Sequence, residues 1–148
     1  MKTFINNRRA SFDFEILDTF EAGISLLGTE VKSVRHGQGK LEGTHVIIRG
    51  GEAFLVGASI PAFQRANAPA DFDPERPRKL LLSKKELARL ETEGEQAGLT
   101  IVPLRLYNNN RRIKLTVALV RGKKKRDKRE TIKQRDTKRS IERILKNQ

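Results

Sequence analysis

The residues of this chain that could do chemistry are cations gathered near its C-terminus. Residues 111–148 contain 16 Lys and Arg against 4 Asp and Glu, whereas the first 110 residues sum to a net charge of only +1. Clustered cations repel one another unless a polyanion neutralises them. Nucleic acid is the expected polyanion, because a tail that served only solubility would gain more from acidic residues. The sequence therefore predicts a near-neutral body that carries a nucleic-acid-binding tail.

An anionic membrane surface is the other polyanion to consider, and the apolar residues of the tail argue against it. A helix that lies on a membrane needs a continuous apolar face, but Ile132 and Ile141 would fall on opposite sides of a helix. No apolar run approaches the ~20 residues that span a bilayer. The first residues also lack the apolar block of a signal peptide. We therefore expect a cytoplasmic protein with no membrane partner.

The remaining residues offer little for catalysis or metal binding. The chain has no cysteine, which excludes disulfides and thiolate metal sites. The two histidines, His36 and His45, are too few for a typical zinc site, and we expect neither to bind a metal. Asp13, Glu21 and Glu30 could pair for acid–base work, but scattered carboxylates are more often solvated or paired with arginines. Because no phosphate-binding or hydrolase motif occurs, we expect neither an enzyme nor a cofactor.

The body that must position the binding residues shows the alternation of short β-strands. The expected strands cover residues 12–16, 22–28, 45–49, 52–59, 102–106 and 112–119. Gly50 and Gly51 suit the turn of a hairpin, and residues 108–110 suit the turn between the last two strands. Pro103 lacks an N–H, so its strand should lie at an edge or carry a bulge there. Because closure hides the edges of short strands, we predict a mainly β protein built as a small closed antiparallel barrel.

Two helices, with room for a third, complete the expected body. Thr29 is a candidate N-cap and Gly37 a candidate stop for a short helix between them. Ser83 and Glu86 form a capping box for a second helix, which should run from about residue 84 to residue 97.

Two segments, a proline-rich loop and the basic tail, lack the patterns of strands and helices that pack in a core. Residues 61–77 hold four of the five prolines and should form a loop. No core-forming pattern remains after Val120, so we expect a body of residues 1–120 and a tail of residues 121–148. The tail should be disordered when free and helical when a polyanion takes up its charge.

Six sequence blocks occur in an order that is typical of one family. They are NNRRA at 6–10, FEAGISLLGTEVKSVRHG at 20–37, GEAFLVGASI at 51–60, PRKLLLSKKEL at 77–87, VPLRLY at 102–107 and GKKKRDKRE at 122–130. Over essentially its full length, the chain resembles the SsrA-binding proteins, the SmpB family. The resemblance implies a barrel similar to the oligonucleotide-binding fold.

The same resemblance implies a noncatalytic role in trans-translation. The family binds the tRNA-like domain of transfer-messenger RNA and delivers it to the A site of stalled ribosomes, where the tail probes the empty mRNA channel beyond the decoding centre. The implied partners are transfer-messenger RNA, the ribosome and, indirectly through the RNA, elongation factor Tu; we expect a monomer. A constitutive ribosomal protein and an RNA-modifying or RNA-cleaving enzyme are the alternative classes.

The resemblance also implies which residues bind RNA and ribosome. The RNA-binding face maps to Asn7, Arg8, Arg9, Glu21, Lys32, Arg35, Leu81, Lys114 and Lys124. Glu21 would either accept a specific hydrogen bond from RNA or orient Arg8 or Lys114 through a salt bridge. Leu81 would either pack on an unstacked base or lie in the core, and the core is favoured. The ribosome-binding part of the tail maps to Gly122, Lys123, Asp127, Lys128, Arg129, Ile144, Leu145 and Lys146.

Overall fold

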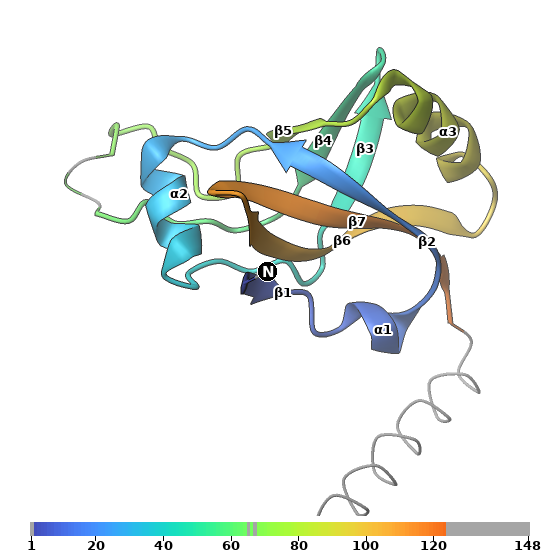
Figure 1. The fold of residues 1–148 in the computed structure, drawn as a ribbon, viewed down its shortest axis with the longest axis horizontal. Coiled ribbons are helices and arrows are strands. Elements are labelled where there is room, and N and C mark those ends of the chain that lie inside the picture. Colours follow the sequence, from blue (N-terminus) through green and yellow to red (C-terminus); the bar gives the residue numbers. More distant parts are fainter. Residues whose placement is uncertain (1, 65, 67, 124–148) are drawn as a thin grey trace, which may run out of the picture.

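The fold is known from a computed structural model, which describes residues 2–64, 66 and 68–123 (Figure 1). Its centre is a seven-stranded antiparallel sheet in the order β1-β6-β7-β2-β5-β4-β3. The strands are β1 (Lys2–Asn6), β2 (Phe14–Ile24), β3 (His45–Arg49), β4 (Glu52–Val56), β5 (Arg78–Leu81), β6 (Leu99–Asn109) and β7 (Arg112–Gly122). The helices are α1 (Ala10–Asp13), α2 (Gly28–Arg35) and α3 (Lys84–Gly94). The predicted mainly β architecture is confirmed.

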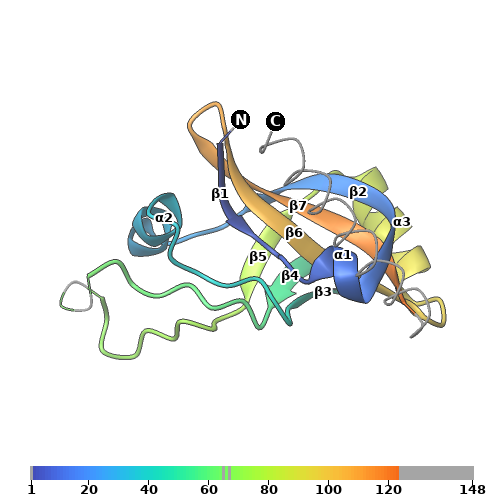
Figure 2. The same cartoon turned by 90° about the horizontal axis from the view of Figure 1, so that it is seen from below.

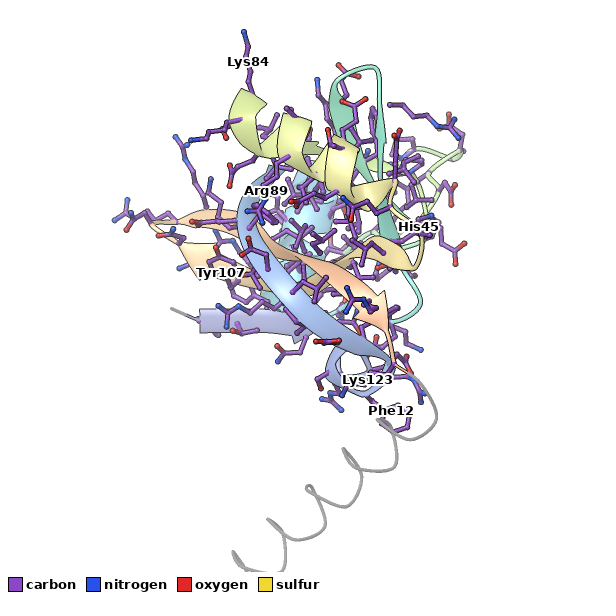
Figure 3. All side chains as sticks on the ribbon, turned by 90° about the vertical axis from the view of Figure 1, so that its right-hand side faces the viewer. Phe12, His45, Lys84, Arg89, Tyr107 and Lys123 are labelled. Carbon is purple, nitrogen blue, oxygen red and sulfur yellow. The ribbon has the colours of Figure 1, made fainter. Side chains whose placement is uncertain are left out.

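The sheet curls around the core but does not close. Strands β1 and β3 are its two edges, and no ladder joins them in the described part of the chain. Helix α3 packs against β3, β6 and β7 (Figures 1 and 3). Its Leu90 is fully buried in the core. The predicted closed barrel is therefore wrong, because β3 meets β6 without a backbone ladder and α3 packs against both of these strands.

Strand β2 is one long strand where the sequence suggested two. It runs without interruption from Phe14 to Ile24 and takes up an extra residue, Leu17, as a bulge against β7. The first predicted strand starts two residues too early, because Phe12 and Asp13 belong to the helical turn α1. Figure 2 shows β1, which the sequence analysis missed, lying beside β6 as an edge strand.

The predicted turns and the proline bulge are largely confirmed. Gly50 and Gly51 join β3 to β4 with φ of +59° and +74°, values that glycine adopts without strain. The ladder between β6 and β7 shifts register just after Pro103, as its missing N–H predicts. The hairpin that follows turns at Asn110 and Arg111, one residue later than expected.

The core fills the concave side of the sheet. Ile113, Leu115, Val117 and Leu119 of β7 are all buried there, as their alternation predicts. On β6 the bulge reverses the faces, so Val102 packs in a second, smaller cluster instead of sharing a face with Leu106. The alternation of Val102, Leu104 and Leu106 in the sequence suggests that they share one face, and this interpretation is therefore wrong.

The helix ends also differ from the sequence analysis. In α3 the predicted cap is present, since Ser83 Oγ accepts from the Glu86 N–H at 3.2 Å, but the helix ends at Gly94, short of residue 97. In α2 the residue before the first turn is Leu27, and the Thr29 hydroxyl instead accepts from the Phe63 N–H at 2.8 Å. Thr29 therefore fastens the proline-rich loop to the helix.

A buried ion pair fastens the same loop from its other end. Glu30 of α2 and Arg78 of β5 are both fully buried, and Arg78 Nε donates to Glu30 Oε2 at 3.0 Å. Arg76 also binds Glu30, and Arg78 Nη1 donates to the Ala58 carbonyl at 2.7 Å. Burial on its own would raise the pKa of Glu30, but the hydrogen bonds from Arg76, Leu27 and Arg78 outweigh it and lower that pKa.

The described chain ends close to the expected border between body and tail. Strand β7 continues to Gly122, two residues past the predicted end of the body. Residues 124–148, and with them the expected helix formation and disorder of the tail, lie outside the described residues. No helix in the described part is both long and apolar enough to cross a bilayer.

Candidate RNA interface

Three of the predicted RNA-binding residues line one hollow. Arg35, Leu81 and Lys114 come from α2, β5 and β7, and they meet in a hollow of about 310 Å³. We call it the cationic hollow, because its lining combines cations with apolar side chains and contains no acidic residue. The lining consists of Gly23, Ile24, Leu26, Val31, Arg35, Leu81, Arg111, Arg112, Ile113 and Lys114.

Leu81 is the apolar member of the hollow that lies most open to solvent. It is 60% exposed, whereas its neighbour Leu80 is 2% exposed. The strand period turns alternate residues to opposite faces, so one of the two must point outward. Gly23 pairs with Leu81 across β2 and β5, and a Cβ at Gly23 would lie 3.2 Å from the Leu81 Cβ. The core alternative for Leu81 is therefore wrong.

Arg35 ties the end of α2 to the turn between β6 and β7. Its Nη2 donates to the Arg111 carbonyl at 3.0 Å, and its guanidinium lies 5.8 Å from the centre of the Phe4 ring. Arg111 has φ of +66°, a left-handed conformation that costs a residue with a side chain about 1–2 kcal/mol. The bond from Arg35 therefore helps to hold a strained turn that presents Arg111 and Arg112 to the hollow. Lys32 is exposed one turn earlier on α2 and does not line the hollow.

Glu21 takes its hydrogen bonds from two residues that the sequence analysis missed. Asn109 Nδ2 donates to Glu21 Oε1 at 2.9 Å, and the Tyr107 hydroxyl also donates to this carboxylate. These two bonds, with a smaller effect from the charge of Lys114, lower the pKa of Glu21. Burial, followed by the hydrogen bond and charge of Glu21, raises the pKa of Tyr107 to about 12.

The salt-bridge alternative for Glu21 is therefore wrong in the form we gave it. The partners that hold the carboxylate are Tyr107 and Asn109 of β6, and Lys114 acts on it through its charge alone. A signal for this arrangement was present in the sequence, since Tyr107 and Asn109 are two residues apart and so share one face of a strand. Whether Glu21 also accepts a hydrogen bond from RNA stays a prediction.

The N-terminal members of the predicted face lie apart from the cationic hollow. Asn7 Nδ2 donates to the Pro103 carbonyl at 2.8 Å, which makes Asn7 a latch on the bulge of β6. Its Oδ1 is buried and has no hydrogen-bond partner among the described protein groups. Arg9 binds Asp13 at 3.3 Å, and Arg8 is exposed beside a second hollow that Lys40 also lines.

The root of the tail is bound to α1. The Lys123 N–H donates to the Asp13 carbonyl at 2.9 Å, and Lys123 Nζ donates to the Ser11 carbonyl at 2.7 Å. Gly122, the last residue of β7, pairs with Phe14. The other predicted RNA and ribosome contacts of the tail lie outside the described residues: Lys124, Asp127, Lys128, Arg129, Ile144, Leu145 and Lys146.

The histidines have ordinary surroundings. His36 Nδ1 lies 2.8 Å from the Lys32 carbonyl oxygen, and its ring lies 4.5 Å from that of Phe63. His45 is exposed on the edge strand β3 (Figure 3). In the part of the chain that the structure describes, no three His, Cys, Asp or Glu residues come together as a possible metal site.

The chemistry that the cationic hollow supports is the binding of a structured polyanion. Guanidinium and ammonium groups meet phosphate oxygens, and an exposed apolar side chain offers a surface to an unstacked base. Glu21, held beside these cations by Tyr107 and Asn109, adds an acceptor for a base edge or a ribose hydroxyl. This combination is typical of RNA recognition by shape and by selected base contacts.

Comparison with known proteins agrees with this chemistry. The family model described as SmpB protein matches residues 4–147. An SsrA-binding protein of Chelativorans sp. (strain BNC1) is 50% identical over 145 residues, which cover 97% of this chain and 93% of that protein. An SsrA-binding protein of Thermosynechococcus vestitus is 48% identical, over 99% of this chain and 96% of that protein.

A solved structure shares the fold. It carries the description "tmRNA-SmpB: a journey to the center of the bacterial ribosome", and one of its chains is 45% identical to this one. The two superpose with a TM-score of 0.68 over 86% of this chain and 92% of that chain.

Proposed function

The chain belongs to the SmpB family, and on that premise we propose that it binds the tRNA-like domain of transfer-messenger RNA and delivers it to the A site of stalled ribosomes for trans-translation. In this role the protein is a noncatalytic, cytoplasmic RNA-binding factor that acts as a monomer. Its partners are transfer-messenger RNA and the ribosome, with elongation factor Tu joined indirectly through the RNA.

The cationic hollow is the observation that supports RNA binding most directly. Arg35, Leu81 and Lys114 converge there from three elements that are far apart in the sequence. The exposed Leu81 has no role in the core, so its position favours contact with a partner. We propose that the cations bind phosphates and that Leu81 packs on an unstacked base of the RNA.

The remaining predicted contacts extend this face. Arg8, Arg9 and Lys32 are exposed and suited to phosphates at its margin. Glu21 can accept a further hydrogen bond from RNA beside those from Asn109 and Tyr107, whereas Asn7, whose Oδ1 is buried, is retained as a contact on the family resemblance alone. Lys124 adds a cation just beyond the described chain.

We assign the tail a separate task, in line with the family. The body, in which β7 continues to Gly122, selects the RNA, and the basic residues of the predicted tail beyond Lys123 enter the empty mRNA channel of the ribosome, becoming helical there. The ribosome contacts that the family resemblance implies are Gly122, Lys123, Asp127, Lys128, Arg129, Ile144, Leu145 and Lys146.

The proposal is tested by comparing the RNA affinity of two variants, one that removes a lysine of the cationic hollow and one that removes a lysine outside it. Lys114→Ala should weaken binding of transfer-messenger RNA and flatten its logarithmic salt dependence by about 0.7–0.9, the slope of one lost phosphate contact. Lys79→Ala is the matched control, since Lys79 is exposed on β5, binds Glu52 at 3.1 Å and does not line the hollow. Filter binding at several salt concentrations measures both variants.

One further variant tests the apolar contact. Leu81→Ser should reduce affinity at every salt concentration without a change in folding, because the side chain is exposed. Equal affinities for Lys114→Ala and Lys79→Ala, together with an unaffected Leu81→Ser, would show that RNA binds elsewhere on the molecule.

A further inference from the structure

The chain leaves the sheet under three successive constraints. Arg121 forms an ion pair with Glu15 at 3.7 Å, Gly122 pairs with Phe14 across β2 and β7, and Lys123 reaches α1 with both its backbone and its side chain. Figure 3 shows Lys123 next to Phe12 at the place where the chain leaves the body. Lys123 is the last of the described residues.

The two bonds of Lys123 have different effects. The bond from its N–H to the Asp13 carbonyl, at 2.9 Å, prolongs the contact between β7 and the segment before β2 by one residue. The bond from its Nζ to the Ser11 carbonyl, at 2.7 Å, places an ammonium at the C-terminal end of a helical turn. The last carbonyls of a helix lack intrahelical partners and carry partial negative charge, so a cation is favourable there.

In the structure, the Lys123 ammonium is already used in a contact within the protein. Its side chain is half-buried, and its ammonium already donates to a carbonyl of the body. We propose that Lys123 is a positioning residue, which holds the root of the tail against α1 and so sets the direction in which the following residues leave the body.

The two bonds of Lys123 to Asp13 and Ser11, which we call the clamp, link the tail to the N-terminal RNA-binding segment. Arg9 precedes α1 and binds the carboxylate of Asp13, whose carbonyl receives the Lys123 N–H. A body that is fixed on RNA through this segment therefore also fixes the start of the tail. The functional consequence rests on the proposed function, because only a ribosome-rescue factor needs the tail to point into the mRNA channel.

The existence of the clamp is tested on the free full-length protein, without RNA or ribosome. Lys123→Met keeps the apolar stem and removes the ammonium, so amide hydrogen exchange at residue 123 and in α1 should become about tenfold faster, the factor for one lost hydrogen bond to a charged group. Lys123→Arg should keep slow exchange, because a guanidinium can donate to the same carbonyl. Lys125→Met removes the same charge two residues later and should leave exchange unchanged.

Peptide tagging on a message without a stop codon tests the consequence. Lys123→Met should lower tagging several-fold while leaving the affinity for transfer-messenger RNA within about twofold of wild type, and Lys123→Arg should restore tagging. Unchanged amide exchange in Lys123→Met would overturn the existence of the clamp.

Faster exchange with normal tagging, or an equal loss of tagging in Lys123→Met and Lys125→Met, would overturn the positioning role of Lys123. Absence of tagging with the wild-type protein would instead refute the proposed function, and the exchange experiment would still decide whether the clamp exists.

Discussion

Glu30→Gln is expected to destabilise the body strongly, although the change removes only a charge. The Glu30 carboxylate is fully buried and is the partner of two arginines, of which Arg78 is fully buried as well. The glutamine keeps the shape of the side chain but leaves the Arg78 guanidinium as a buried charge without a counter-ion. Breaking a buried pair from one side costs about 3–5 kcal/mol.

Two features place the expected value near the lower end of that range. Arg78 keeps its bonds to the carbonyls of Ala58, Ile60 and Pro74, and the amide oxygen of the glutamine can still accept a hydrogen bond. We therefore expect the free energy of unfolding to fall by about 3 kcal/mol, which lowers the melting temperature of a domain of this size by roughly 10 °C.

The control is the same substitution in an exposed ion pair. Glu52 binds Lys79 at 3.1 Å with both side chains about half exposed, and such pairs contribute about 0–1 kcal/mol. Urea unfolding followed by circular dichroism gives the free energy of each variant. Similar losses for Glu30→Gln and Glu52→Gln would refute the view that Glu30 and Arg78 hold α2 and the proline-rich loop to the sheet.

Three further outcomes are expected from named contacts. Folding lowers the pKa of Glu30, so its stabilising effect is present above the ordinary value of 4.5 and lost as the pH falls below it; the acid-induced loss of stability should be smaller in Glu30→Gln. Tyr107 is the only tyrosine and has a pKa of about 12. Ultraviolet absorbance at about pH 11 should therefore show about a tenth of it ionised, against about nine-tenths for a pKa of 10, and Glu21→Gln should increase that fraction. Gly39→Ala should destabilise the body by about 1–3 kcal/mol in a thermal melt, because φ is +150° and the new Cβ would lie 2.8 Å from Ile5 Cδ1.

The elements that could be predicted from the sequence are those with local signals. Gly50 and Gly51 specify their hairpin through the backbone angles that glycine tolerates, and Ser83 specifies the start of α3 through a bond to an N–H three residues away. The strand of residues 112–119 was predictable because β7 alternates without a bulge. In each case the signal is contained in one short stretch of the sequence.

The features that could not be predicted depend on contacts between distant residues. Glu30 and Arg78 are 48 residues apart, and nothing local distinguishes this carboxylate from an exposed one. Leu81 lies in a run of three leucines, where the strand period gives no preferred face, and only its pairing with Gly23 shows that it points outward. Closure of the barrel failed as a prediction for the same reason, since it depends on how β3 meets β6, a strand that is distant in the sequence.

The candidate interface was likewise predictable from the sequence only in part. The family resemblance supplied Arg35, Leu81 and Lys114, which the structure brings together in the cationic hollow. It did not supply Tyr107 and Asn109, which hold Glu21, because their role depends on the alignment of β2 with β6 across β7. It placed Lys123 among the ribosome contacts, which stays a prediction, and it did not supply the bond from the Lys123 ammonium to the Ser11 carbonyl of α1.

The division of labour between body and tail is the central claim, and truncation after Lys123 tests it most directly. This end point keeps β7 and the contacts of Lys123 with α1 complete. The truncated protein should bind transfer-messenger RNA within a few-fold of the full chain and should support no peptide tagging on a message without a stop codon. Tagging at the level of the full chain, or loss of RNA binding in a folded truncated protein, would contradict the account.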